Sequence, residues 1–128
     1  MNQQQGYLER GYAFPTKRYC QVLSLKDNPA LIAEYRRIHG AAESWAEIRE
    51  GIRSVGILEM EIYISGSQAF MIVETPLEFE WDKAMEQLAH LPRQQEWEDY
   101  VSRFPQCAPG STSGQKWKLM ERIFYLYE

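Results

Sequence analysis

The sequence holds little of what several common protein classes require. Its 128 residues include two cysteines and two histidines. Cys20 and Cys107 make no disulfide framework, and neither has a partner at the spacing of metal ligands. A membrane span needs about 20 apolar residues, whereas the longest apolar runs, such as residues 69–73, are short. The N-terminus lacks the basic-then-apolar pattern of a signal peptide. We therefore expect no metal site, no membrane span and a reducing, cytoplasmic compartment.

The charge of the chain gives a second exclusion. It carries 18 acidic and 14 basic residues, for a net charge of −4, and has no block of lysines and arginines. A chain of this kind is not expected to bind nucleic acid or an anionic membrane. Its hydrophobic content of 45% is enough for a folded core. At this length we expect one domain over residues 17–128, preceded by a loosely ordered leader over residues 1–16.

The order of the expected elements is β-α-β-β-α-β. Alternation and β-rich composition predict strands over four ranges, 17–25, 57–64, 68–75 and 116–127. Apolar residues at helical spacing fall between them, over 30–39, 44–55, 79–90 and 94–104. This order predicts an α+β fold of the ferredoxin-like kind, with an antiparallel sheet that helices cover on one face.

Local signals predict where some of these elements begin and end. The run Asp27-Asn28-Pro29 is expected to start the first helix, because an Asx side chain can accept hydrogen bonds from its free amides and proline fits the first helical position. Ser44 and Glu47 have the spacing of a capping box. Gly56 is placed to end the second helical segment. A short loop around Gly66, between two β-rich runs, predicts a hairpin.

The sheet face that the helices leave uncovered predicts a partner. Met60 and Ile62 alternate along one strand with Glu61 and Tyr63. An uncovered face that holds Met, Ile, Tyr and Trp side chains would be a large apolar patch on a monomer. We therefore expect a homodimer that packs through this open face and forms a dimeric α/β barrel.

The first helix carries the most informative group of side chains. Leu31, Tyr35 and His39 lie at i, i+4 and i+8, so they stack on one face about 5.4 Å apart. An imidazole exchanges protons near neutral pH, and a phenol one turn away would reach the same small polar ligand. The structural alternative is that Tyr35 packs in the core and His39 caps the helix end.

Two other groups have both a functional and a structural interpretation. Glu59 and Glu61 share one strand face with Glu74 on the next strand, and paired carboxylates serve acid–base chemistry. Alternating glutamates are more often a solvated or ion-paired face. Likewise, Trp45, Trp81 and Trp97 fall on expected core stripes, although an indole ring also stacks on the apolar face of a sugar.

Several segments of the chain together resemble the L-rhamnose mutarotase family. They are Lys17–Leu25, Glu34–His39, Ser54–Gly56, Glu61–Tyr63, Gln95–Trp97 with Tyr100, and Glu121–Leu126. The resemblance spans about residues 17–126. It implies a dimeric α/β barrel of ferredoxin-like topology that interconverts the α and β anomers of a 6-deoxy-L-hexose, L-rhamnose or L-fucose. It also implies that the reaction needs no cofactor.

The resemblance also assigns roles to individual residues. His39 matches the proton-transferring histidine of the family, and Tyr35 matches a substrate-contacting tyrosine. Trp45 and Trp97 match tryptophans of the sugar site. Two positions depart from the family pattern, because Glu98 replaces a second stacking tryptophan and Met60 replaces a substrate-contacting tyrosine. Both departures bear on which sugar is bound, and the run Pro92–Glu98 resembles the branch associated with L-fucose.

Two other functions are compatible with the same fold. One is a monooxygenase or dehydratase of the dimeric barrel type, which acts on an aromatic substrate. The other is a domain that binds a small ligand without catalysis. Fold alone does not separate these alternatives from a mutarotase.

Overall fold

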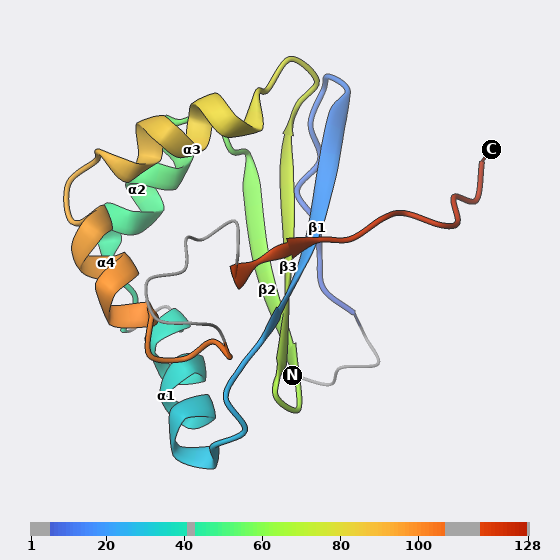
Figure 1. Ribbon diagram of the computed structural model, residues 1–128. Helices are drawn as coiled ribbons and strands as arrows, with labels where there is room; N and C mark the ends of the chain where they lie inside the picture. Colours follow the sequence, from blue (N-terminus) through green and yellow to red (C-terminus); the bar gives the residue numbers. More distant parts are fainter. Residues whose placement is uncertain (1–5, 41–42, 107–115, 128) are drawn as a thin grey trace.

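The chain folds into two layers, a sheet and a set of helices that lie against one face of it (Figure 1). This computed structural model describes residues 6–40, 43–106 and 116–127. The helices are α1 (Pro29–His39), α2 (Ala46–Ser54), α3 (Trp81–Ala89) and α4 (Gln94–Val101), and the strands are β1 (Thr16–Ser24), β2 (Glu59–Ser65), β3 (Gln68–Pro76) and β4 (Lys118–Leu119). The expected α+β class and element order are therefore confirmed.

The four strands form one antiparallel sheet in the order β2-β3-β1-β4. Placing the first and third strands side by side, with the second and fourth at the edges, is the ferredoxin-like arrangement. The pairing of Ser65 with Gln68 leaves Gly66 and Ser67 as the hairpin turn. Gly66 has φ +58°, a backbone conformation that glycine adopts without steric cost. The hairpin predicted around Gly66 is thus confirmed.

The cap of α1 follows the sequence, whereas that of α2 does not. The Asn28 side-chain oxygen accepts hydrogen bonds from the amides of Ala30 and Leu31, at 3.0 and 3.2 Å. The capping box expected at Ser44 is wrong, because α2 begins after Trp45 and no side chain caps it. The Ser44 hydroxyl instead accepts a hydrogen bond of 2.8 Å from Nε of Arg49.

The core lies between the sheet and the helices. It centres on six buried residues, Leu23, Leu25, Tyr35, Ile38, Ala69 and Phe104. In β3, Ala69, Val73 and Thr75 alternate with less buried residues, so the first set faces the helices. Phe104 lies just beyond α4 and is 1% exposed. The core therefore joins α1, β1, β3 and the end of α4.

The composition expected for the open face needs correction. The register places Met60 and Ile62 beside Val73 and Met71, on the helix-covered face. The open face instead carries acidic side chains together with apolar and aromatic ones, namely Glu59, Glu61, Tyr63, Phe70, Ile72, Glu74, Arg18, Cys20 and Val22. The open face is therefore a mixed polar and apolar surface rather than the apolar one expected, because Met60 and Ile62 pack beneath the helices.

The long final strand expected over residues 116–127 is also wrong. Only Lys118–Leu119 forms a strand against β1, and the Met120 amide donates one further hydrogen bond of 2.7 Å to the Cys20 carbonyl. The segment after Met120 leaves the sheet on the side opposite the helices (Figure 1). A β-rich sequence becomes a strand only where a neighbouring strand accepts and donates its backbone hydrogen bonds. No helix in the described ranges has the length and apolar character needed to cross a membrane.

Candidate functional site

The two side chains singled out on α1 do lie together. The ring centroids of Tyr35 and His39 are 4.2 Å apart. Nδ1 of His39 lies 2.7 Å from the backbone carbonyl oxygen of Tyr35. A carbonyl oxygen only accepts hydrogen bonds, so we assign the proton to Nδ1. This leaves Nε2 of the neutral ring with a lone pair that can accept a proton.

The surroundings of His39 favour its neutral form. Burial lowers the pKa of the imidazole, the hydrogen bond to the Tyr35 carbonyl raises it, and the charge of Arg49 lowers it. Together these effects hold the pKa of the imidazole below its usual value of 6.5. The helix C-terminus would favour the charged ring, but burial is the larger effect here. At neutral pH the ring is therefore a base rather than a cation.

Tyr35 combines a core position with an accessible hydroxyl. It is 4% exposed and packs at 5.4 Å, edge to face, against Phe104. Burial raises the pKa of its phenol above the usual 10.0, so the hydroxyl keeps its proton at neutral pH. Within the described ranges, no enclosed side-chain oxygen or nitrogen lacks a hydrogen-bond partner, and no hydrogen bond to this hydroxyl is found. The hydroxyl therefore borders accessible space.

Two tryptophans extend the ring cluster beyond His39. The indole of Trp97, on α4, lies 5.5 Å from the His39 ring at an interplanar angle of 77°. Trp45, just before α2, lies 5.2 Å from Trp97. These rings form one cluster, in which Tyr35 and Trp97 contact His39 and Trp45 contacts Trp97. Trp81 is elsewhere, at 4.7 Å from Tyr19.

The remaining two residues of the expected site differ in their surroundings. Met60 is half-buried and faces the helices from β2. Glu98 follows Trp97 on α4, and its carboxylate accepts a hydrogen bond of 3.0 Å from the amide of Gln94. Gln94 is only 5% exposed, so this bond fixes the carboxylate against a buried neighbour. Their contact with a sugar stays a prediction.

Arg93 is a residue that sequence reasoning missed. Its guanidinium lies 4.1 Å over the ring of Trp45 and 3.2 Å from a carboxylate oxygen of Glu47. Arg93 has φ +65°, a left-handed conformation that is uncommon for a residue with a side chain. It precedes α4 in the chain, so it joins the start of this helix to Trp45. The pattern of the sequence gives no signal for this contact.

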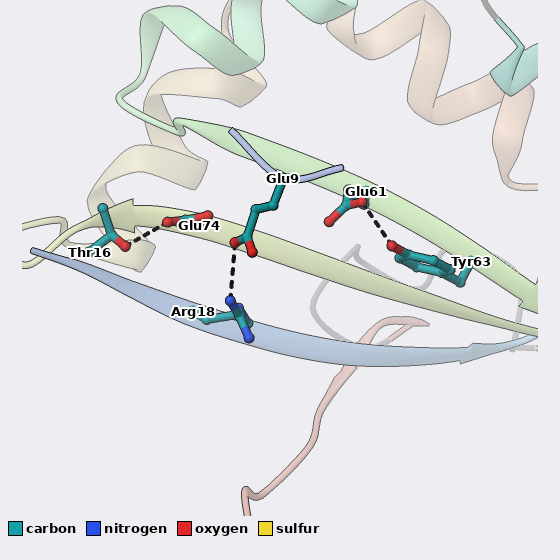
Figure 2. A network of polar contacts seen from close by, with 6 residues as sticks. All are labelled: Glu9, Thr16, Arg18, Glu61, Tyr63 and Glu74. Carbon is teal, nitrogen blue, oxygen red and sulfur yellow. Dashed lines mark hydrogen bonds and ion pairs between the residues drawn. The ribbon is translucent and has the colours of Figure 1, made fainter. Parts of the chain in front are cut away.

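The glutamates predicted to share a strand face do so on the open side of the sheet. Thr16 donates a hydrogen bond of 2.6 Å to Glu74, and Tyr63 donates one of 2.8 Å to Glu61 (Figure 2). Arg18 pairs with Glu9 of the N-terminal segment at 3.3 Å. A cavity of about 170 Å³ lies on this face, and its lining consists of Tyr7, Glu9, Arg18, Glu59, Glu61, Tyr63, Ile72 and Glu74. The glutamates thus form a hydrogen-bonded face, as in the structural interpretation.

The N-terminal segment closes part of this open face. The Tyr12 hydroxyl donates a hydrogen bond of 2.8 Å to Glu59, which raises the pKa of that phenol. Tyr7 packs edge to face on Tyr63 at 5.7 Å. A second cavity, of about 390 Å³, lies between Gly56, Phe79 and α3. His39 lines neither cavity, and in the described ranges no three His, Cys, Asp or Glu side chains are placed to hold a metal.

Comparisons with known proteins place this chain in a family. The family model for L-rhamnose mutarotase matches residues 18–126. An L-fucose mutarotase of Xanthomonas campestris is 38% identical over 112 residues, which cover 88% of this chain and 90% of that protein. A UPF0734 protein of Dictyostelium discoideum is 30% identical over 86% of this chain and 90% of its own length.

A solved structure agrees with the fold. The crystal structure of an L-rhamnose mutarotase from Formosa agariphila superposes with a TM-score of 0.60 at 17% identity, over 86% of this chain and 98% of that one. The fold is that of a small α+β protein whose antiparallel sheet is covered by helices on one face. The chain belongs to the L-rhamnose mutarotase family. It is a sugar mutarotase, an isomerase that interconverts anomers.

Proposed function

We propose that His39 and Tyr35 open and close the ring of a 6-deoxy-L-hexose, with His39 as the base. The observation that carries this proposal is the 2.7 Å hydrogen bond from Nδ1 of His39 to the Tyr35 carbonyl. It fixes the tautomer that leaves Nε2 free to accept a proton. The lowered pKa of His39 and the raised pKa of Tyr35 give a base and a protonated donor at the same pH.

The reaction needs two proton movements and no covalent intermediate. Nε2 of His39 takes the proton from the anomeric hydroxyl as the C1–O5 bond breaks and the C1=O1 bond forms. The Tyr35 hydroxyl orients O5 or relays to it the proton that His39 has taken up, so the open aldehyde, the imidazole and the phenol are all neutral. Rotation about C1–C2 and the reverse proton movements close the other anomer. Positioned acid–base groups contribute about 10²–10⁴-fold in rate.

The neighbouring side chains would hold the sugar. Trp97 lies beside the imidazole at 5.5 Å, where its indole would stack on the apolar face of a pyranose ring. Trp45 packs edge to face against Trp97 at 5.2 Å. In this proposal Met60 contacts the methyl group of the 6-deoxy sugar, and Glu98 accepts hydrogen bonds from the hydroxyl groups of the sugar. The Xanthomonas relative is an L-fucose mutarotase and the Formosa protein an L-rhamnose mutarotase, which supports these two sugars as substrates.

We also propose that the protein is a homodimer. The C-terminal arm, which we define as residues 120–127, exposes large apolar side chains, namely Met120 38%, Ile123 89%, Phe124 73%, Tyr125 43%, Leu126 69% and Tyr127 81%. It projects from the side of the sheet opposite the helices (Figure 1). An exposed apolar surface of this kind marks an interaction site.

A second copy of this chain is the occupant that we propose for the arm. The open face carries apolar and aromatic side chains beside its glutamates, among them Tyr63, Phe70 and Ile72, which the apolar arm would cover. We propose that each arm crosses onto the open face of the other copy and continues its sheet there.

We propose that the catalytic domain comprises residues 17–128, with residues 1–16 as its leader. The compartment we propose is the cytoplasm, where the free thiol of Cys20 is stable.

Exchange of anomers by nuclear magnetic resonance tests the function directly. Saturation transfer between the α and β signals of L-fucose, L-rhamnose and D-glucose is measured with and without the protein. We expect faster exchange of a 6-deoxy-L-hexose, and loss of about 10²-fold or more of the added rate in His39→Ala. His90→Ala is the matched control, because His90 is exposed at the end of α3.

Two results would refute the proposal. One is exchange that the protein does not accelerate, which would leave a binding domain if the sugar still binds. The other is undiminished exchange in a folded His39→Ala variant, which would remove the imidazole from the reaction.

A further inference from the structure

Gln21 is a polar residue in an otherwise apolar row of the sheet. It lies on the helix-covered face of β1, paired with Met71 of β3 on one side and Leu119 of β4 on the other. Ile62 of β2 continues the same row. Gln21 is 7% exposed. An amide in such a place costs free energy unless its donors and acceptor are satisfied.

Within residues 6–40, 43–106 and 116–127, no hydrogen-bond partner is found for this amide. The described residues form no hydrogen bond to the Gln21 side chain, and none of their enclosed side-chain nitrogen or oxygen atoms lacks a partner. The amide atoms are therefore not fully enclosed, and a water molecule can reach them. A leucine or methionine would fill the same position without the cost of an unpaired amide. Packing alone therefore does not explain an amide at this position.

Gln21 and His39 lie on the same side of the sheet, because Gln21 faces the helices and His39 ends α1. The chain turns back after β1, so α1 runs along the strand in the opposite direction (Figure 1). Tyr35 packs in the same core cluster as Leu23. Four residues of helix advance about 6 Å, and two residues of strand about 6.6 Å. The distance from Tyr35 to His39 along α1 is thus about equal to the distance from Leu23 back to Gln21 along β1.

We propose that Gln21 determines which sugar is bound, by hydrogen bonds from its amide to ring hydroxyls of a sugar held beneath His39. This inference rests on the proposed function of the site. An amide both donates through its NH₂ group and accepts through its oxygen, as a pair of neighbouring hydroxyls does. It does not titrate, so it acts through binding and orientation rather than proton transfer. A site built to hydrogen-bond a hydroxyl discriminates strongly against a substrate that lacks it.

The substitution Gln21→Met tests this role because methionine has a similar length and no amide. We expect kcat/KM for L-fucose exchange to fall about tenfold or more, mainly through a higher KM. The pH profile of exchange should keep its shape, since His39 still moves the proton. The thermal midpoint should stay equal or rise, because the unpaired amide has gone. Gln21→Leu is the second variant, in case the methionine packs poorly.

Deoxy sugars separate binding from a general packing effect. With the wild type, one of the monodeoxy L-fucose analogues should lose affinity, and Gln21→Met should lose little more on that analogue. Thr75→Val is the matched control, since Thr75 is a fully buried polar residue on the same sheet face whose hydroxyl bonds to Pro76. Exchange should be unchanged in this control.

The outcomes distinguish the two proposals. If the wild type exchanges anomers and both Gln21 variants keep its KM and its ranking of the analogues, the role of Gln21 is overturned and the proposed function stands. If the wild type itself does not accelerate exchange, the proposed function fails first. A loss of kcat alone, with a changed pH profile, would also overturn a binding role for the amide.

Discussion

Nδ1 of His39 lies 2.7 Å from the backbone carbonyl oxygen of Tyr35, one helical turn earlier in α1. The bond joins the two residues expected to carry the reaction, and it does so through the backbone of one and the side chain of the other. It holds the imidazole ring 4.2 Å from the phenol ring. The tautomer of the base is therefore set by the helix itself, without a separate carboxylate.

His39 makes the stability of the fold depend on pH. Its folded pKa is lower than the usual 6.5, so just below pH 6.5 the unfolded chain binds more protons than the folded one. The stabilising contribution is fully present above that pH and is lost as the pH falls toward the lowered pKa. Thermal unfolding between pH 8 and pH 5 should show a falling midpoint, with a smaller slope in His39→Gln. An identical slope in His39→Gln and wild type would contradict this assignment.

Removing the phenol hydroxyl should slow exchange without unfolding the protein. In Tyr35→Phe the ring still fills the core, and the described part of the chain offers no hydrogen bond for the hydroxyl to lose. We expect the exchange rate to fall about tenfold or more, measured by saturation transfer, with a thermal midpoint near that of wild type. Tyr63→Phe is the control, because it loses its bond to Glu61 on the opposite sheet face. Exchange as fast as wild type in Tyr35→Phe would leave Tyr35 with a packing role only.

Trp97 should act through sugar binding. Trp97→Phe keeps an aromatic ring but shortens the platform, so we expect KM to rise several-fold with a smaller effect on kcat. Titration with L-fucose should change the tryptophan fluorescence of the wild type more than that of Trp97→Phe. The control is Trp81→Phe, since Trp81 packs against Tyr19 and Phe79 away from the imidazole. Equal KM values in wild type and Trp97→Phe would speak against stacking.

The C-terminal arm should decide the oligomeric state. Ile123→Asp together with Phe124→Asp places two charges on side chains that are 89% and 73% exposed in the single chain. We expect this variant to be a monomer by light scattering on a sizing column, because burying those carboxylates in an interface is costly. Leu77→Asp is the control, as Leu77 is exposed at 54% but lies outside the arm. A wild type that is monomeric at all concentrations, or a double variant that still dimerises, would refute the proposed exchange of arms.

The sequence by itself determined the class of fold and the pair on α1. Asn28 starts a helix through its own side chain, and a spacing of four residues puts Tyr35 and His39 on one helical face. These are local relations, fixed by the geometry of a single helix. Alternation along β2 likewise separated Met60 from Glu61, because successive residues of a strand point to opposite faces. The resemblance supplied the activity, which the family match confirms.

Only the tertiary structure decided which contacts join distant segments. Alternation showed that Met60 and Glu61 face opposite ways, but the helices decided that Met60 is on the covered side. The expected capping box at Ser44 does not form, and the Ser44 hydroxyl accepts a hydrogen bond from Arg49 instead. The contact of Arg93 with Trp45 and the burial of Gln21 depend on how the helices pack against one another and on the sheet. Such contacts arise from packing between elements, and no pattern within one element encodes them.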